Sequence, residues 1–88
     1  MTNKDKTFER IMNKVVPKDI TFTELRSFLI SRGFDMIPGK GDHVIFRHRG
    51  LKQHLSIPAA RIVKCAYIKN VQKAILILMS GVTENEQY

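Results

Sequence analysis

The chain has 88 residues, enough for one domain with a single hydrophobic core but too few for an enclosed cleft between two domains. It carries 15 Lys and Arg against 8 Asp and Glu, and this net charge of +7 favours polyanionic partners such as nucleic acid or an acidic protein. A single cysteine excludes an internal disulfide, and no Cys/His spacing is typical of a zinc site. The longest apolar run is far too short to span a membrane. We expect a soluble, cytoplasmic protein with a shallow surface site and without a metal or another cofactor.

The charge is unevenly distributed along the sequence. Three of the eight acids lie within residues 1–19, and two more, Glu84 and Glu86, lie near the C-terminus. Between Lys40 and Lys73 the chain has eight Lys or Arg and only one acid, Asp42. This segment is therefore the part most suited to contact phosphates.

The first predicted helix lies in an N-terminal extension over residues 1–19. Its apolar residues recur at spacings of three and four, which is typical of one buried stripe on a short helix that Pro17 closes. The stripe consists of Phe8, Ile11, Met12 and Val15.

A better-marked helix follows. Thr21 and Glu24 match a capping box, and Ile20 and Leu25 occupy the two positions of a hydrophobic staple. Gly33 provides a left-handed stop. The apolar residues of this helix, which we expect on its buried face, are Phe22, Leu25, Phe28 and Leu29.

After Gly33 the apolar pattern changes to a period of two. Three short alternating runs, over residues 34–37, 43–47 and 54–57, are separated by turns rich in glycine and basic residues, which predicts an antiparallel meander. Pro58 ends the third strand, and a last helix with one broad apolar face stops at Gly81. The residues expected on that face are Tyr67, Ile68, Val71, Ala74, Ile75 and Leu78.

The predicted fold is α+β, in the order α-α-β-β-β-α, with the helices packed on one face of a three-stranded antiparallel sheet. Strand alternation then divides the side chains into two sets. The set facing the helices is Phe34, Val44, Phe46, Leu55 and Ile57. The set on the open face is His43, Ile45, Arg47, Lys52, His54 and Ser56.

Several motifs in this order resemble the HicA toxin family of bacterial toxin–antitoxin systems. They are Thr-Phe-Thr-Glu-Leu at 21–25, Arg-Gly-Phe at 32–34, GKGDHVIFRH at 39–48, LSIP at 55–58 and VKCAYIKNVQKAI at 63–75. The resemblance covers residues 20–78. It implies a fold like that of a double-stranded-RNA-binding domain and a HicA-like domain over residues 20–81, followed by a tail at 82–88. It further implies cleavage of mRNA and neutralisation by a HicB-type antitoxin.

The family's active histidine follows a glycine and usually a serine, so the resemblance implies that His43 is catalytic. Asp42 stands at the serine position. A carboxylate there would stabilise a protonated histidine but would also repel an approaching phosphate. RNA carries its own nucleophile, the 2′-hydroxyl, so cleavage can proceed without a metal; His43 as general base, with Arg47 and Lys40 to stabilise the charge on the phosphate, would supply two of the three functions needed. The predicted RNA-binding residues are Lys40, Arg47, Lys52, His54 and Lys64.

Some alternatives stay open at this point. The proton donor for the leaving oxygen is not identified, although His54 or Lys52 is conceivable. A module of the same fold that binds RNA without cleaving it explains the basic residues equally, whereas few aromatics are available for a protein-interaction domain. The sequence fixes neither an RNA sequence preference nor the oligomeric state.

Overall fold

The computed structural model describes residues 3–80, and the side chains from residue 6 onward. The helices are α1 (Asn3–Ile11), α2 (Phe22–Ser31) and α3 (Cys65–Met79), and the strands are β1 (Asp35–Pro38), β2 (His43–Arg47) and β3 (Leu55–Pro58). The described part therefore has the predicted order α-α-β-β-β-α. The predicted stop at Gly81 and the tail at 82–88 lie outside the described residues.

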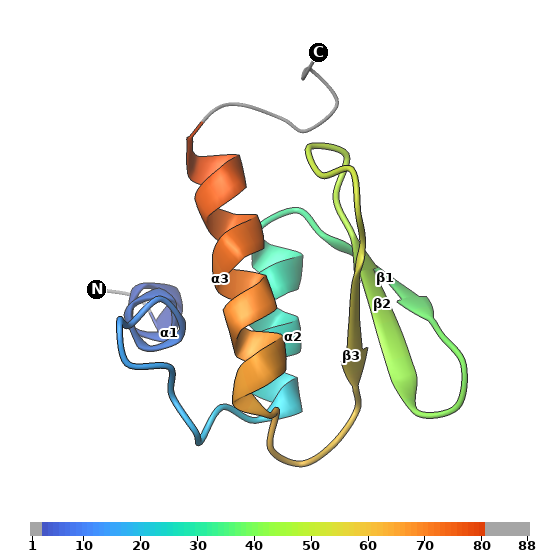
Figure 1. Ribbon diagram of the computed structural model, residues 1–88, viewed down its shortest axis with the longest axis horizontal. Coiled ribbons are helices and arrows are strands. Elements are labelled where there is room, and N and C mark those ends of the chain that lie inside the picture. The colour runs from blue at the N-terminus through green and yellow to red at the C-terminus, as the bar shows by residue number, and fades with distance from the viewer. Residues whose placement is uncertain (1–2, 81–88) are drawn as a thin grey trace.

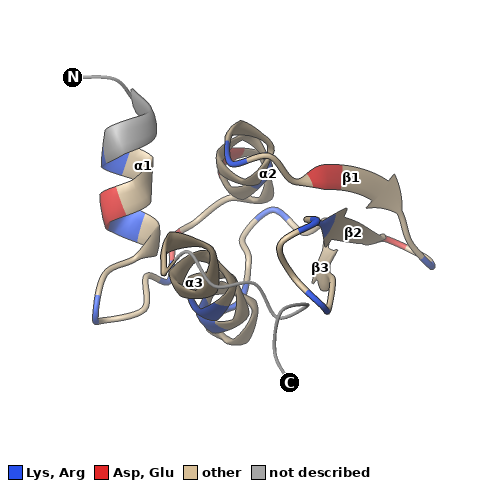
Figure 2. Cartoon of the chain, turned by 90° about the horizontal axis from the view of Figure 1, so that it is seen from above, with Lys and Arg blue, Asp and Glu red and all other residues tan. Residues whose placement is uncertain are grey.

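The elements form layers. The strands make an antiparallel sheet in the order β1-β2-β3. In Figure 1, α2 and α3 lie against one face of this sheet, and α1 lies on the other side of these helices, away from the sheet. No described helix or strand covers the opposite face of the sheet in either ribbon view (Figures 1 and 2). The predicted α+β fold with helices on one face is confirmed.

The start of α2 follows from its sequence. Thr21 is the N-cap, and its Oγ1 accepts a hydrogen bond of 3.1 Å from the backbone N–H of Glu24. Ile20 and Leu25 are both fully buried, as the hydrophobic staple requires. The Glu24 side chain pairs with Arg10 of α1. Of the two hydrogen bonds of the predicted capping box, the one that Thr21 accepts is therefore present, whereas the Glu24 side chain binds Arg10.

The strand register sets which side chains enter the core. β2 is the central strand, with Phe46 opposite Met36 of β1 and Leu55 of β3. Val44 is likewise opposite Ile57. Phe46 is completely buried, and its ring centroid lies 6.2 Å from that of Phe22 on α2. The central strand therefore anchors the sheet to the helices through alternate residues.

The N-terminal extension contributes to the same core. Ile11 is fully buried, and Gln72 of α3 donates hydrogen bonds to the carbonyls of Ile11 (2.7 Å) and Asn13 (3.0 Å). Arg10 also pairs with Asp19, at 3.1 Å. These contacts hold α1 against the outer side of the helix layer.

One apolar residue differs from the sequence prediction. Val15 is 79% exposed, because α1 ends at Ile11 and the chain then turns, with the Val15 N–H donating to Asn13 Oδ1 at 3.1 Å. Val16 packs against the core instead. Met36 lies opposite Phe46 on the helix side of the sheet and is nevertheless 45% exposed, because β1 is an edge strand with a neighbour on one side only.

Candidate active site

The turn before β2 is tightly bonded. The His43 N–H donates to the Lys40 carbonyl at 3.1 Å, and the Gly39 N–H donates to the His43 carbonyl at 3.0 Å. Gly41 has a φ of 63° whereas Asp42 has a negative φ, as in the type II′ turns that close hairpins. A Cβ on Gly39 would lie 2.9 Å from the His43 carbonyl oxygen. Both glycines are therefore required for the backbone path that leads into His43.

His43 begins β2 and its side chain is exposed. It shares the open face of the sheet with Ile45 and Arg47, because alternate residues of a strand lie on one face. Its neighbour in the register of β3 is Pro58, and its backbone partner on the β1 side is Gly39. Neither neighbour carries a side chain able to transfer a proton. Of the chemical groups near this end of β2, Lys40 and Asp42 are the closest in sequence.

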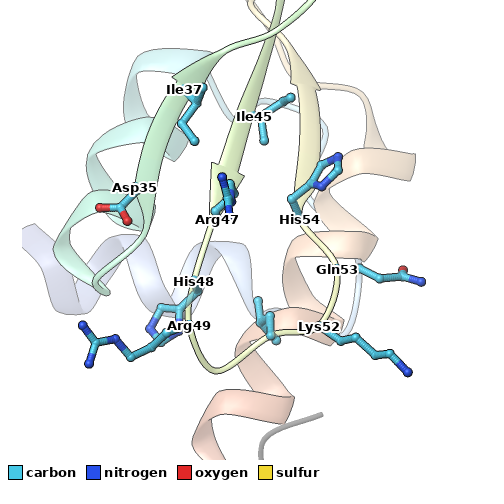
Figure 3. Close-up of a pocket in the computed structure, with 10 residues that line it drawn as sticks. Asp35, Ile37, Ile45, Arg47, His48, Arg49, Lys52, Gln53 and His54 are labelled. Carbon is cyan, nitrogen blue, oxygen red and sulfur yellow. The ribbon is translucent and has the colours of Figure 1, made fainter. Parts of the chain in front are cut away.

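The other end of the open face holds a shallow pocket of about 850 Å³, which we call the Arg47 hollow (Figure 3). Its walls come from β1, from β2 and from the segment between β2 and β3. The residues used below are Asp35, Ile37, Ile45, Arg47, Lys52 and His54. In Figure 3, the side chains of Arg49 and Lys52 extend outward from the turn, while Ile37 and Ile45 lie across the sheet face above Arg47.

The structure divides the predicted site residues into two groups. His43 and Arg47 are four residues apart along β2, a separation of roughly 13 Å at the usual rise of a strand. Lys40 belongs to the His43 end of the sheet, whereas Lys52 and His54 line the Arg47 hollow. The structure therefore does not bring His54 or Lys52, the conceivable proton donors, to His43.

Lys64 lies apart from both groups. It is the N-cap of α3, and its side chain is exposed and makes no capping hydrogen bond. α3 lies on the covered side of the sheet, so Lys64 is not part of the open face. Figure 2 shows other Lys and Arg positions along α3 and on the loops around the sheet, which makes the basic surface wider than the open face alone.

His48 has a structural role. Its Nδ1 accepts a hydrogen bond of 2.9 Å from the Gly50 N–H, and its ring lies edge-on to Phe34 with 5.0 Å between centroids. Because Nδ1 accepts this bond, the ring proton of the neutral form is on Nε2. Its half-buried position follows the alternation that places Val44 and Phe46 on the helix side of the sheet.

The sequence prediction did not include Asp35, Ile37 and Ile45 among the site residues. The signal that could have found them was present, since the alternation that exposes Arg47 also places Ile45 on the same face. Asp35 is opposite Arg47 in the register of β1 and β2, and Ile37 is opposite Ile45. The register between strands was the missing information.

Comparisons with protein-family models, with curated proteins and with solved structures found no match to this chain. The motifs quoted above are therefore the basis of the likeness to HicA toxins. Among residues 3–80, no helix has both the length and the apolar character needed to cross a membrane. Within the same range, no cluster of three or more His, Cys, Asp or Glu side chains is arranged to hold a metal ion.

Proposed function

We propose that this protein is an endoribonuclease toxin of the HicA type, which cleaves mRNA without a metal and is neutralised by a HicB-type antitoxin. The observation that carries the proposal is the position of His43. This histidine is exposed on a sheet face that no described element covers, directly after a turn whose backbone is fixed by hydrogen bonds and by two required glycines. The glycine, Gly41, and the histidine are also the residues that the family motif matches.

The proposed chemistry uses the RNA's own nucleophile. His43 accepts the proton of a ribose 2′-hydroxyl, and the resulting oxygen attacks the adjacent phosphorus. The bond from phosphorus to the 5′-oxygen of the next nucleotide then breaks, and that oxygen takes up a proton. Because His54 and Lys52 are remote, this proton comes from solvent, from Lys40 or from the histidine after it is protonated. Lys40 in the turn offsets the negative charge that develops on the phosphate.

An open sheet face suits a flexible, single-stranded substrate. In-line attack requires the 2′-hydroxyl to rotate behind the scissile bond, which an unpaired strand permits and a regular duplex resists. Among residues 3–80, no helix or strand covers this site. An acidic antitoxin that covers the His43 end would block access and neutralise the positive charge together.

The test is cleavage of a single-stranded transcript by wild-type protein and by the His43→Ala variant. We expect the variant to cleave at least about a hundredfold more slowly, which is the usual contribution of a general base. The His54→Ala variant is the matched control, since a histidine remote from the reacting atoms changes the RNA concentration needed but not the maximal rate. Wild-type activity is expected to persist in EDTA. Equal cleavage by wild type and His43→Ala would disprove the proposed role.

A second candidate is a module that binds RNA without cleaving it. The observation that favours it is the separation of His43 from the Arg47 hollow, together with the carboxylate of Asp42 beside the histidine. For such a module, purified wild-type protein leaves RNA intact but still binds it, and His43→Ala changes the affinity little. A transcript that stays intact after incubation with folded, purified wild-type protein would therefore favour this second function.

A further inference from the structure

The Arg47 hollow has an apolar floor on a face that is open to solvent. Ile37 and Ile45 are opposite each other in the register of β1 and β2, and both are only half-buried. The outward face of a sheet is usually polar, because apolar side chains gain little stability there. Two adjoining isoleucines between His43 and Arg47 therefore form an apolar patch in line with the candidate catalytic residue.

Basic side chains stand at one side of this floor. Arg47 and His54 both line the hollow and are exposed. Asp35 is opposite Arg47 in the register, yet among the described residues no salt bridge within 4.0 Å joins the Arg47 guanidinium to a carboxylate. An unpaired guanidinium can bind a phosphate through two parallel hydrogen bonds.

We propose that the Arg47 hollow binds one nucleotide of a single-stranded RNA, with its base against Ile37 and Ile45 and its phosphate on Arg47 and His54. Ligand sites commonly combine an apolar surface with a few polar groups that fix the orientation. The inference rests on the proposed RNA substrate. It gives the RNA strand a second contact point, in addition to the one at the His43 end of the sheet. The hollow thus anchors the strand away from the bond that is cleaved.

The distance between His43 and Arg47 sets how many nucleotides separate the cleaved bond from the nucleotide that the hollow binds. His43 and Arg47 are roughly 13 Å apart along β2. A stacked strand rises roughly 3.4 Å per nucleotide, so this distance corresponds to about four stacked nucleotides and to fewer in an extended strand. An oligonucleotide too short to reach both ends is therefore bound and cleaved less well than one that spans them.

The test measures binding with RNA that cannot be cleaved. A fluorescent single-stranded oligonucleotide with 2′-O-methyl groups lacks the nucleophile, so its affinity can be followed by anisotropy over a range of salt concentrations. We expect Arg47→Ala to weaken binding about tenfold and to reduce the magnitude of the slope of log K against log salt by about 0.7, the value for one phosphate contact on a single strand. Ile45→Ala is expected to weaken binding about threefold without changing the slope, because an apolar contact releases no counterion.

Lys14→Ala is the matched control for loss of one positive charge. Lys14 follows Asn13, which is bonded to the outer side of α3, so it lies away from the open face. This variant is expected to bind like wild type. Equal binding by Arg47→Ala and Lys14→Ala would overturn the inference, as would the absence of measurable oligonucleotide binding by the wild type.

The outcomes separate this inference from the proposed function. If cleavage depends on His43 while Arg47→Ala binds normally, the nuclease proposal stands and the nucleotide subsite is wrong. If the wild type does not cleave RNA but the effect of Arg47→Ala on affinity is present, the subsite stands in a binding module and the nuclease proposal is wrong. Melting temperatures of all variants check that each protein is folded.

Discussion

The two faces of β2 differ in what covers them, although they come from the same five residues. Val44 and Phe46 lie against the helix layer, and Phe46 is completely buried. His43, Ile45 and Arg47 alternate with them and lie on the face that no described element covers. The strand therefore contributes to stability through one set of side chains and presents candidate chemical groups through the other.

This arrangement links the register of the strand to the candidate site. A slip of one residue would exchange the two sets and turn His43 toward the core. The apolar residues of the covered face oppose that slip, because it would expose Phe46 and bury Arg47. Residues that never contact a substrate thus determine which side chains a substrate can reach.

The largest expected effect concerns the covered face. Phe46→Ala should lower the free energy of unfolding by about 3–5 kcal/mol, because it removes a fully buried ring from the core. The matched variant on the open face, Ile45→Ala, should lower it by about 1 kcal/mol, since its side chain is only half-buried. Urea unfolding followed by circular dichroism measures both values. Equal losses would mean that the two faces are not distinguished by burial.

The next effect concerns the turn that leads into the open face. Gly41→Ala should cost about 1–2 kcal/mol, because an L-residue at a φ of 63° is strained even though a Cβ there would meet no atom within 4 Å. Gly41→Asn is the control and should recover part of the loss, since asparagine tolerates this region better. Thermal unfolding of the two variants gives the comparison. An unchanged melting temperature for Gly41→Ala would show that the turn can rearrange without cost.

A smaller effect is expected in the helix layer. Thr21→Ala should destabilise the protein by about 1 kcal/mol, because it removes the acceptor for the Glu24 N–H at the start of α2. Thr23→Ala provides the control, as Thr23 is exposed and makes no capping bond in the described structure. That variant should change the free energy of unfolding by less than about 0.5 kcal/mol. Equal effects would contradict the capping role of Thr21.

The smallest effect on stability is expected at the candidate catalytic residue. His43→Ala should change the free energy of unfolding by less than about 0.5 kcal/mol, because its side chain is exposed. His48→Ala should cost about 1 kcal/mol or more, since its Nδ1 accepts the Gly50 N–H and its ring packs against Phe34. Denaturant titrations of both variants test this difference between two histidines on one segment. A large loss for His43→Ala would indicate a structural role instead.

Much of the fold could be predicted because its signals are local. The cap at Thr21, the left-handed Gly33 and the alternation around Phe46 each depend on residues a few positions apart. Val15 was assigned to the wrong surface, because spacing alone did not show that α1 ends at Ile11. The 45% exposure of Met36, which lies opposite Phe46, could not be predicted either, since alternation gives the face of a strand but not whether that strand is an edge.

The sequence by itself determined the order of the elements and the sharing of one face by His43 and Arg47, because backbone geometry repeats over two to four residues. Tertiary structure decided how far this face extends and which residues meet on it. Asp35 and Ile37 join Arg47 and Ile45 through the register of β1 and β2, while His54 lies at the opposite end from His43. Such distances depend on the pairing of segments remote in the chain, which no local pattern specifies.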